Sequence, residues 1–320
     1  MKSPNPNTAE IPSRFRDVQH TPLMRMLVRG FIRSAGFLPV WLMRVLAVSL
    51  VLPIAIPLTG RNFRGILANM GRMDPGGSGV RRILNSWAVY RNYAYYLIDL
   101  LYLSHGRGRA REYRTTIIGG ENLYKALKQG KGVVLLTAHL GNWEIGGEAI
   151  GVTGKKIHLV YAPDSSAVFE HQRNLMRGET SVEGVALKPG ELVSLKLYRL
   201  LEQGELVALQ GDRLQFDRGV SISFFGSPAT FPQGAVRIAQ LSGSPIVPIF
   251  IPLKGYKTYE IIIEEPLVME PDKRVEDNLA KLLAVFERQI GRYKTQWYMF
   301  MPFWDIDQER LTKNKGRDIF

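Results

Sequence analysis

The stretch that most constrains how this chain can fold is Gly132 to Glu148, GVVLLTAHLGNWEIGGE. Its first part, Gly132 to Ala138, is a short apolar run rich in β-branched residues, which is typical of a buried strand. From Asn142 onward the pattern is that of a short amphipathic helix ending near Gly151. We therefore expect a buried strand, a turn through residues 140–142 and a helix.

His139 and Glu144 lie at this junction. On one continuous helix, residues five apart point about 140° apart and do not meet. With an intervening turn, His139 closes the strand and Glu144 enters the first turn of the helix, so the two side chains converge beyond the carboxyl end of the strand, where open α/β sheets place their ligands. A histidine held by a carboxylate is a general base suited to deprotonating a hydroxyl that attacks an acyl group. The alternative is an ordinary, partly buried histidine, because a chain with 5 His and 29 acidic residues produces this spacing by chance.

The rest of the chain alternates strands and helices, which predicts an α/β fold with a mixed, largely parallel central sheet flanked by helices. Strands are expected at Val133–Ala138, Ile157–Tyr161, Leu206–Leu209, Ile222–Phe225, Ile246–Ile251 and Tyr259–Ile263. Helices are expected at Arg81–Leu103, Glu121–Gln129, Asn142–Ile150, Ser166–Met176, Glu191–Glu202, Gln233–Leu241 and Val275–Tyr293.

The N-terminal part is both basic and apolar. Residues 1–120 carry 17 Lys and Arg against 5 Asp and Glu, which is almost the whole net charge of +13. Leu23–Ile32 suits a basic interfacial helix, and Ser34–Gly60 holds a single charge, Arg44. We expect residues 1–60 to form a tail and membrane-anchoring helices, and residues 61–320 to form the catalytic domain. The alternative is a hydrophobic hairpin packed on the domain, since Pro53 and Pro57 are expected to end or kink a helix.

Several classes of protein are disfavoured. There is no basic stripe with interleaved aromatics, so we expect a membrane surface and no nucleic acid as partner. There is no G-x-S-x-G elbow, P-loop or G-x-G-x-x-G motif. The absence of cysteine excludes disulfides and fits a cytoplasm-facing location, and the scattered histidines show no metal-ligand spacing.

Two further stretches place arginines where a site is expected. Arg173 and Arg177 stand four residues apart on one predicted helix face, where they can bind a phosphate or an acyl oxyanion, or form a solvated basic face. Asp212 and Arg213 follow an apolar strand. That pair is placed to clamp an anionic group or to brace the histidine base, and the alternative is a structural salt bridge in a turn.

A third stretch, Phe224 to Gly234, sets two aromatic residues beside a glycine-rich turn that opens a helix. Backbone N–H groups at such a helix start can hold an anion. The phenylalanines either line an apolar tunnel or pack in the core.

In this order, the motifs resemble the bacterial lipid A late acyltransferase family, the lauroyl and myristoyl acyltransferases related to the glycerolipid acyltransferases. The likeness spans about residues 115–305 and includes a short N-terminal anchor followed by basic helices. The matching segments are AHLGNWE (138–144), the arginine-bearing segment after YAP (161–163), GDR (211–213), FFGSPATFPQG (224–234) and SGSPIVPIF (242–250).

The resemblance implies an inner-membrane enzyme, with its catalytic domain facing the cytoplasm, that moves a fatty acyl chain from an acyl carrier protein or coenzyme A thioester to a glycolipid hydroxyl. No further cofactor and no metal is expected. His139 would be the base and Glu144 its partner, with a hydrocarbon tunnel that measures chain length. Substrate-binding roles are expected for Asn142, Arg173, Arg177, Asp212, Arg213, Phe225, Gly226 and Gly234.

One segment departs from the family pattern. Gln296 to Trp304, QWYMFMPFW, lacks the basic Arg-Arg-Phe signature of lipid A enzymes and is closer to relatives that acylate other lipids, such as phosphatidylinositol mannosides. The acceptor therefore stays open. Two other functions also stay open: a lipid hydrolase that uses the same two side chains to activate water, and a non-catalytic lipid-binding protein.

Overall fold

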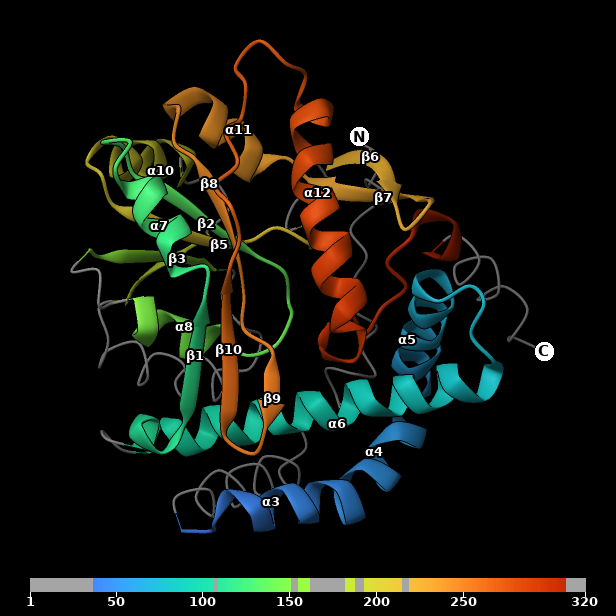
Figure 1. The fold of residues 1–320 in the computed structure, drawn as a ribbon. Coiled ribbons are helices and arrows are strands. Elements are labelled where there is room, and N and C mark those ends of the chain that lie inside the picture. Colours follow the sequence, from blue (N-terminus) through green and yellow to red (C-terminus); the bar gives the residue numbers. More distant parts are fainter. Residues whose placement is uncertain are drawn as a thin grey trace, which may run out of the picture.

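A mixed, mostly parallel sheet of eight strands forms the centre of the protein (Figure 1). The computed structural model describes residues 37–105, 109–150, 155–161, 182–187, 193–214 and 219–308. The strand order is β1-β10-β8-β2-β5-β3-β4, and β9 pairs with β10. The strands are β1 (Arg114–Ile118), β2 (Val133–Thr137), β3 (Ile157–Tyr161), β4 (Val182–Ala186), β5 (Leu206–Gln210), β8 (Ile246–Phe250), β9 (Leu253–Gly255) and β10 (Thr258–Ile263).

Only β10 makes antiparallel pairs in this sheet, with β8 and β9, and the other pairings are parallel. A separate antiparallel hairpin consists of β6 (Gly219–Phe224) and β7 (Ser227–Pro232). The predicted fold class is confirmed.

Helices cover both faces of the sheet. One face packs against α10, α11 and α12, and the other against α7, α8 and the end of α6. The helices are α3 (Val40–Leu46), η1 (Ala47–Val51), α4 (Leu52–Leu58), α5 (Gly60–Met73), α6 (Gly79–Leu103), η2 (Arg109–Glu112), α7 (Gly120–Leu127), α8 (Trp143–Ile150), α10 (Val193–Glu202), α11 (Gly234–Ser242), α12 (Val275–Arg292) and η4 (Lys294–Gln296).

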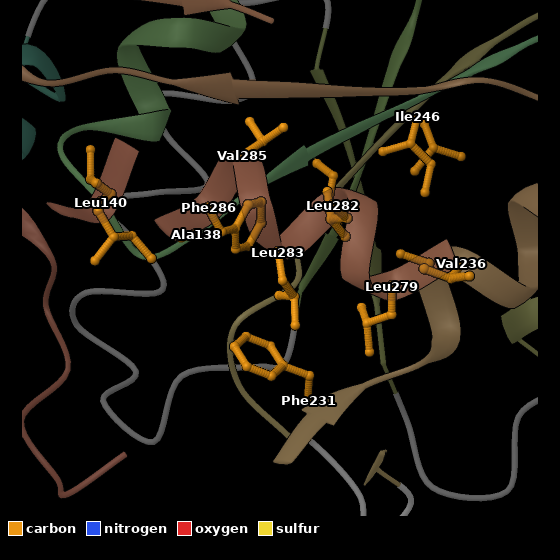
Figure 2. Packing of buried hydrophobic residues seen from close by; sticks show 14 of the residues in the cluster. Ala138, Leu140, Phe231, Val236, Ile246, Leu279, Leu282, Leu283, Val285 and Phe286 are labelled. Atoms are coloured by element: carbon orange, nitrogen blue, oxygen red, sulfur yellow. The ribbon is translucent and has the colours of Figure 1, made fainter. Parts of the chain in front are cut away.

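The larger core cluster lies between the sheet and α12. Figure 2 shows Phe286 of α12 beside Ala138, which follows β2, and Leu283 of α12 pointing toward Phe231 of β7. Because both faces of the sheet are covered, β2 reads VVLLT with its first four residues buried, rather than alternating polar and apolar residues. This packing fixes the carboxyl end of β2 firmly in the interior.

The N-terminal helices lie along the outside of α6. In Figure 1, α6 runs across the lower part of the molecule, and α3 and α4 lie beneath it. Val40–Leu58 is helical throughout and is the one described helix with the length and apolarity to cross a membrane. Pro53 and Pro57 were expected to end or kink the helix: it ends at Leu58, directly after Pro57, but it continues through Pro53. The π-helical segment η1 immediately precedes it, and wider i→i+5 turns relieve the clash between the proline ring and the preceding carbonyls.

A buried ion pair fastens this helix to the domain. The Arg44 guanidinium donates to both carboxylate oxygens of Asp99 in α6, at 3.1 and 2.8 Å. Asp99 is fully buried and also accepts hydrogen bonds from the hydroxyls of Tyr113, at 3.0 Å, and Tyr259, at 2.5 Å. The helix is thus joined through Asp99 to both the sheet and the segment before β1.

Arg44→Met is expected to destabilise the folded protein by about 3–5 kcal/mol, because it leaves the buried Asp99 carboxylate without its counter-ion. Chemical unfolding of the detergent-solubilised protein measures this loss. Arg81→Met is the matched control: Arg81 pairs with Asp74 at 3.5 Å but is largely exposed, so its loss is expected to cost less than about 1 kcal/mol. Equal losses in the two variants would contradict the role given to the buried pair.

Several elements lie outside the sequence prediction. The structure adds α5, β1, β4 and β9, and it resolves the 219–232 segment into a hairpin. β1 reads RTTII with all five residues exposed, so it shows neither the alternating pattern of a half-buried strand nor the continuous apolar run of a buried one. The predicted helices Leu23–Ile32 and Ser166–Met176 fall outside the described residues.

Candidate active site

The register of two neighbouring parallel strands brings His139 and Asp212 together. In the ladder between β2 and β5, Thr137 stands opposite Gln210. Two residues further along each chain come His139 and Asp212, which therefore leave the sheet side by side at its carboxyl edge. That edge is where α/β sheets place their ligands.

A tight turn follows His139, as predicted. Gly141 has φ of 70°, and a Cβ atom there would lie 1.9 Å from the carbonyl oxygen of Ile251, so only glycine fits. The Asn142 N–H donates to the same carbonyl, at 2.9 Å. Helix α8 then begins at Trp143, which places Glu144, a buried residue, in its first turn. The strand, turn and helix predicted for this stretch are confirmed.

Asp212 holds His139 at two points. The imidazole Nδ1 lies 2.6 Å from Oδ1 of Asp212, and the backbone N–H of His139 donates to Oδ2 at 2.9 Å. Burial alone would raise the pKa of this fully buried carboxyl, but the charge and hydrogen bonds of His139, with the nearby charge of Arg213, hold it at about 2. Asp212 is therefore ionised at neutral pH and fixes the proton of the neutral imidazole on Nδ1.

A segment far along the chain completes this pair. The indole N–H of Trp297 donates to Oδ2 of Asp212 at 2.8 Å. The next residue, Tyr298, donates its backbone N–H to the carbonyl of His139 at 2.8 Å. We call residues 297–304 the aromatic strap. It is held on its other side by Asn69 of α5, whose side chain bonds the backbone of Met299, Met301 and Phe303.

Arg213 brings a cation next to the pair. Its Nη2 donates to the Tyr298 carbonyl, whereas its Nε is buried and has no hydrogen-bond partner among the described residues. Burial lowers the pKa of Arg213, and the charge of Asp212 opposes that shift. A guanidinium with an unused donor is chemically suited to an oxyanion or a phosphate.

Aromatic rings line the same region. The rings of Trp143 and His139 meet edge to face, with centroids 5.6 Å apart. Tyr96 of α6 packs on Trp143 at 4.8 Å and on Tyr298 at 5.8 Å. Tyr96 thus brings α6 to the border of the site.

The remaining predicted site residues are placed differently. The Asn142 side chain is buried and its amide lies 3.5 Å from the Tyr259 hydroxyl, within the Asp99 network. Phe225 and Gly226 have φ of 47° and 73° and form the two-residue turn between β6 and β7, and Gly234 begins α11. Their substrate-binding roles stay predictions. Arg173 and Arg177 lie outside the described residues.

The carboxylate bonded to Nδ1 of His139 is thus that of Asp212. The sequence analysis had named Glu144 as the partner of the base and had given Asp212 as one that could brace it. The role of Glu144 stays a prediction. In the described part of the chain, no three His, Cys, Asp or Glu side chains gather as metal ligands. The sequence analysis did not predict that Trp297 contacts the site. It noted Trp297 only as part of the aromatic segment that departs from the family pattern.

Together, the sheet and the histidine–aspartate pair at its carboxyl edge form an arrangement that is typical of α/β enzymes and is chemically suited to general-base catalysis of acyl transfer. The model of the bacterial lipid A biosynthesis acyltransferase family matches residues 27–305, and the chain belongs to that family. It is therefore an acyltransferase that acts on lipids.

Curated relatives carry a more specific name. The chain is 26% identical over 219 residues to the phosphatidylinositol mannoside acyltransferase of Mycobacterium tuberculosis (strain H37Rv), covering 66% of this chain and 67% of the relative. It is 25% identical over 242 residues to the protein of that name in Mycolicibacterium smegmatis, covering 73% of this chain and 75% of the relative.

Proposed function

We propose that this protein transfers a fatty acyl chain from an acyl carrier protein or coenzyme A thioester to a hydroxyl of a membrane glycolipid. The observation that carries the proposal is the hydrogen-bonded chain from Trp297 through Asp212 to Nδ1 of His139. The relatives' names favour a phosphatidylinositol mannoside as acceptor. The donor brings its own activated acyl group, so the proposal needs no resident cofactor.

In the proposed reaction, Nε2 of His139 takes the proton of the acceptor hydroxyl while its oxygen attacks the thioester carbonyl carbon. Ionised Asp212 stabilises the resulting imidazolium. The new C–O bond leaves a tetrahedral oxyanion, for which the Nε–H of Arg213 is the proposed donor. The C–S bond then breaks, and the departing thiolate takes the proton back from Nε2, so that the free thiol and the acylated lipid leave.

Comparing the membrane lipids of a strain that lacks this protein with those of its parent tests the proposal. Mass spectrometry is expected to show one glycolipid short of a single acyl chain in the deletion strain. Purified enzyme given a thioester and that glycolipid separates the rival hydrolase: formation of the acylated lipid supports transfer, whereas free fatty acid alone contradicts it.

We also propose that Val40–Leu58 lies in the plane of one leaflet, the cytoplasmic leaflet of the inner membrane. One side of the helix is buried against the domain along its length, at Val40, Met43, Ala47 and Leu52. The opposite side exposes large apolar side chains. They are Trp41, Val45, Leu50, Val51, Ile54 and Leu58. A one-sided apolar face in a strongly basic region is typical of interfacial helices on anionic membranes.

Replacing Leu50 and Ile54 together with glutamate is expected to weaken binding to anionic liposomes by about 10²–10⁴-fold, because each side chain loses about 1.5–3 kcal/mol of burial in lipid. Cosedimentation measures the loss. Leu241→Glu with Val268→Glu is the matched control, since these side chains are as exposed but lie on the catalytic domain. An equal loss in the control pair would contradict the proposed surface.

The chain contains no cysteine, so single cysteines report the orientation of the helix directly. If the helix lies in the plane, a membrane-impermeant thiol reagent added outside the inner membrane labels neither Phe37→Cys nor Leu58→Cys. Labelling of one of the two from outside would show that the helix spans the bilayer.

A further inference from the structure

Two donors converge on one oxygen of Asp212. Oδ2 accepts from the backbone N–H of His139 at 2.9 Å and from the indole N–H of Trp297 at 2.8 Å. Oδ1 is thereby turned toward Nδ1 of His139, at 2.6 Å. Both other contacts of the carboxylate come from His139 itself, so the indole is the donor outside the histidine that holds the rotation of the carboxylate about its Cβ–Cγ bond.

Trp297 is itself held rigidly. It is almost completely buried, and its ring packs edge to face against Phe303 at 5.1 Å and Trp304 at 6.2 Å. The following residue bonds the carbonyl of His139. A buried N–H donor on a rigidly packed ring can orient a carboxylate precisely, because the ring cannot move with the carboxylate if the carboxylate rotates.

We propose that Trp297 is a positioning residue for the reaction, acting through Asp212 on His139. The inference rests on the proposed function, since it assigns a role within the proposed base. Trp297 holds the carboxylate in the rotamer that keeps the Nδ1 proton in place, and it disperses part of the Asp212 charge. Within the aromatic strap, this role belongs to Trp297, whose indole is the one that bonds Asp212.

Trp297→Phe tests this proposal because it keeps a ring in the cluster and removes only the N–H donor. We expect kcat to fall about 10-fold to 100-fold, the range set by one hydrogen bond to a charged group, with KM unchanged. Without the indole, the Asp212 charge is more concentrated on the imidazole and binds its proton more tightly. The acidic limb of the pH profile of kcat/KM is therefore expected to move to higher pH.

Trp304→Phe is the matched control. Trp304 is equally buried in the same cluster, but its indole N–H donates to the carbonyl of Phe224 at 2.7 Å and not to Asp212. Both variants are expected to lose similar stability. Only Trp297→Phe is expected to change kcat and the pH profile.

His139→Ala in the same assay separates the two claims. If His139→Ala is inactive while Trp297→Phe and Trp304→Phe share one kcat and one pH profile, the proposed function stands and the role of Trp297 is overturned. If His139→Ala is as active as the wild type, the proposed function itself fails. A slow Trp297→Phe with a displaced acidic limb beside a normal Trp304→Phe supports the role of Trp297.

Discussion

His139→Ala is expected to lower kcat by about three orders of magnitude while the protein still folds. A positioned general base contributes about 10²–10⁴-fold, and no other group on the described carboxyl edge has the geometry to replace it. The proposed reaction gives the imidazole a role in proton transfer and none in binding, so KM is expected to change little. Steady-state acyl transfer with a radiolabelled thioester measures both constants.

The control for this variant is His105→Gln. His105 lies at the end of α6, where Nδ1 contacts the carbonyl of Leu101 at 2.7 Å, and it takes no part in the proposed reaction. It is expected to keep wild-type kcat. Thermal unfolding of both variants shows whether they are folded, and near wild-type turnover by a folded His139→Ala would disprove the assignment of the base.

Asp212→Asn is expected to lower kcat by about 10²–10⁴-fold, for a reason that the geometry makes specific. Two N–H donors point at Oδ2, so the amide oxygen of the asparagine must occupy that position. Its NH₂ group then faces Nδ1 of His139 and donates to it. The imidazole proton is forced onto Nε2, the nitrogen that must accept a proton from the acceptor hydroxyl.

Glu144→Gln is the comparison that separates the two carboxylates. If Asp212 is the acid that orients the base, Asp212→Asn loses far more activity than Glu144→Gln, and the pH profile changes only in the former. The same kinetic assay decides this. A larger loss in Glu144→Gln would return the partner role to Glu144, as the spacing in the sequence suggested.

The pKa of Asp212 sets the pH range in which these comparisons are valid. In the folded protein it is about 2, below the value of about 3.9 of an unfolded chain. Ionised Asp212 therefore stabilises the fold at all pH values above about 4, and this stabilisation is lost only as the pH falls toward 2. Assays between pH 5 and 9 report on His139 with Asp212 ionised throughout.

Much of the site could be predicted from the sequence where the information is local. The apolar run before His139, the glycine in the turn and the acidic residue after it define strand, turn and helix within seventeen residues. Which carboxylate bonds the imidazole is not local information, because Asp212 lies 73 residues from His139. It follows from the register of β2 and β5, in which Thr137 pairs with Gln210; the predicted strands ended at Ala138 and Leu209 and so did not align His139 with Asp212.

Other features were beyond prediction because they depend on packing. A π-helical turn before Pro53 lets the apolar helix continue, and propensity alone gives no reason for that turn. The indole of Trp297 reaches Asp212 across 85 residues, and nothing in the aromatic pattern of residues 297–304 distinguishes a donor from a core ring. The buried pair of Arg44 and Asp99 shows why a charge is tolerated in an otherwise apolar helix.

The order in which the segments of the site are translated determines when the site can form. Helix Val40–Leu58, the proposed membrane helix, is translated before the sheet, whereas the indole of Trp297 is translated 85 residues after Asp212, which it contacts. A nascent chain therefore contains His139, the proposed proton acceptor, well before Asp212 and Trp297 have been translated. The proposed base is therefore complete only after residues 297–304 have been translated and have packed into the core beside Asp212.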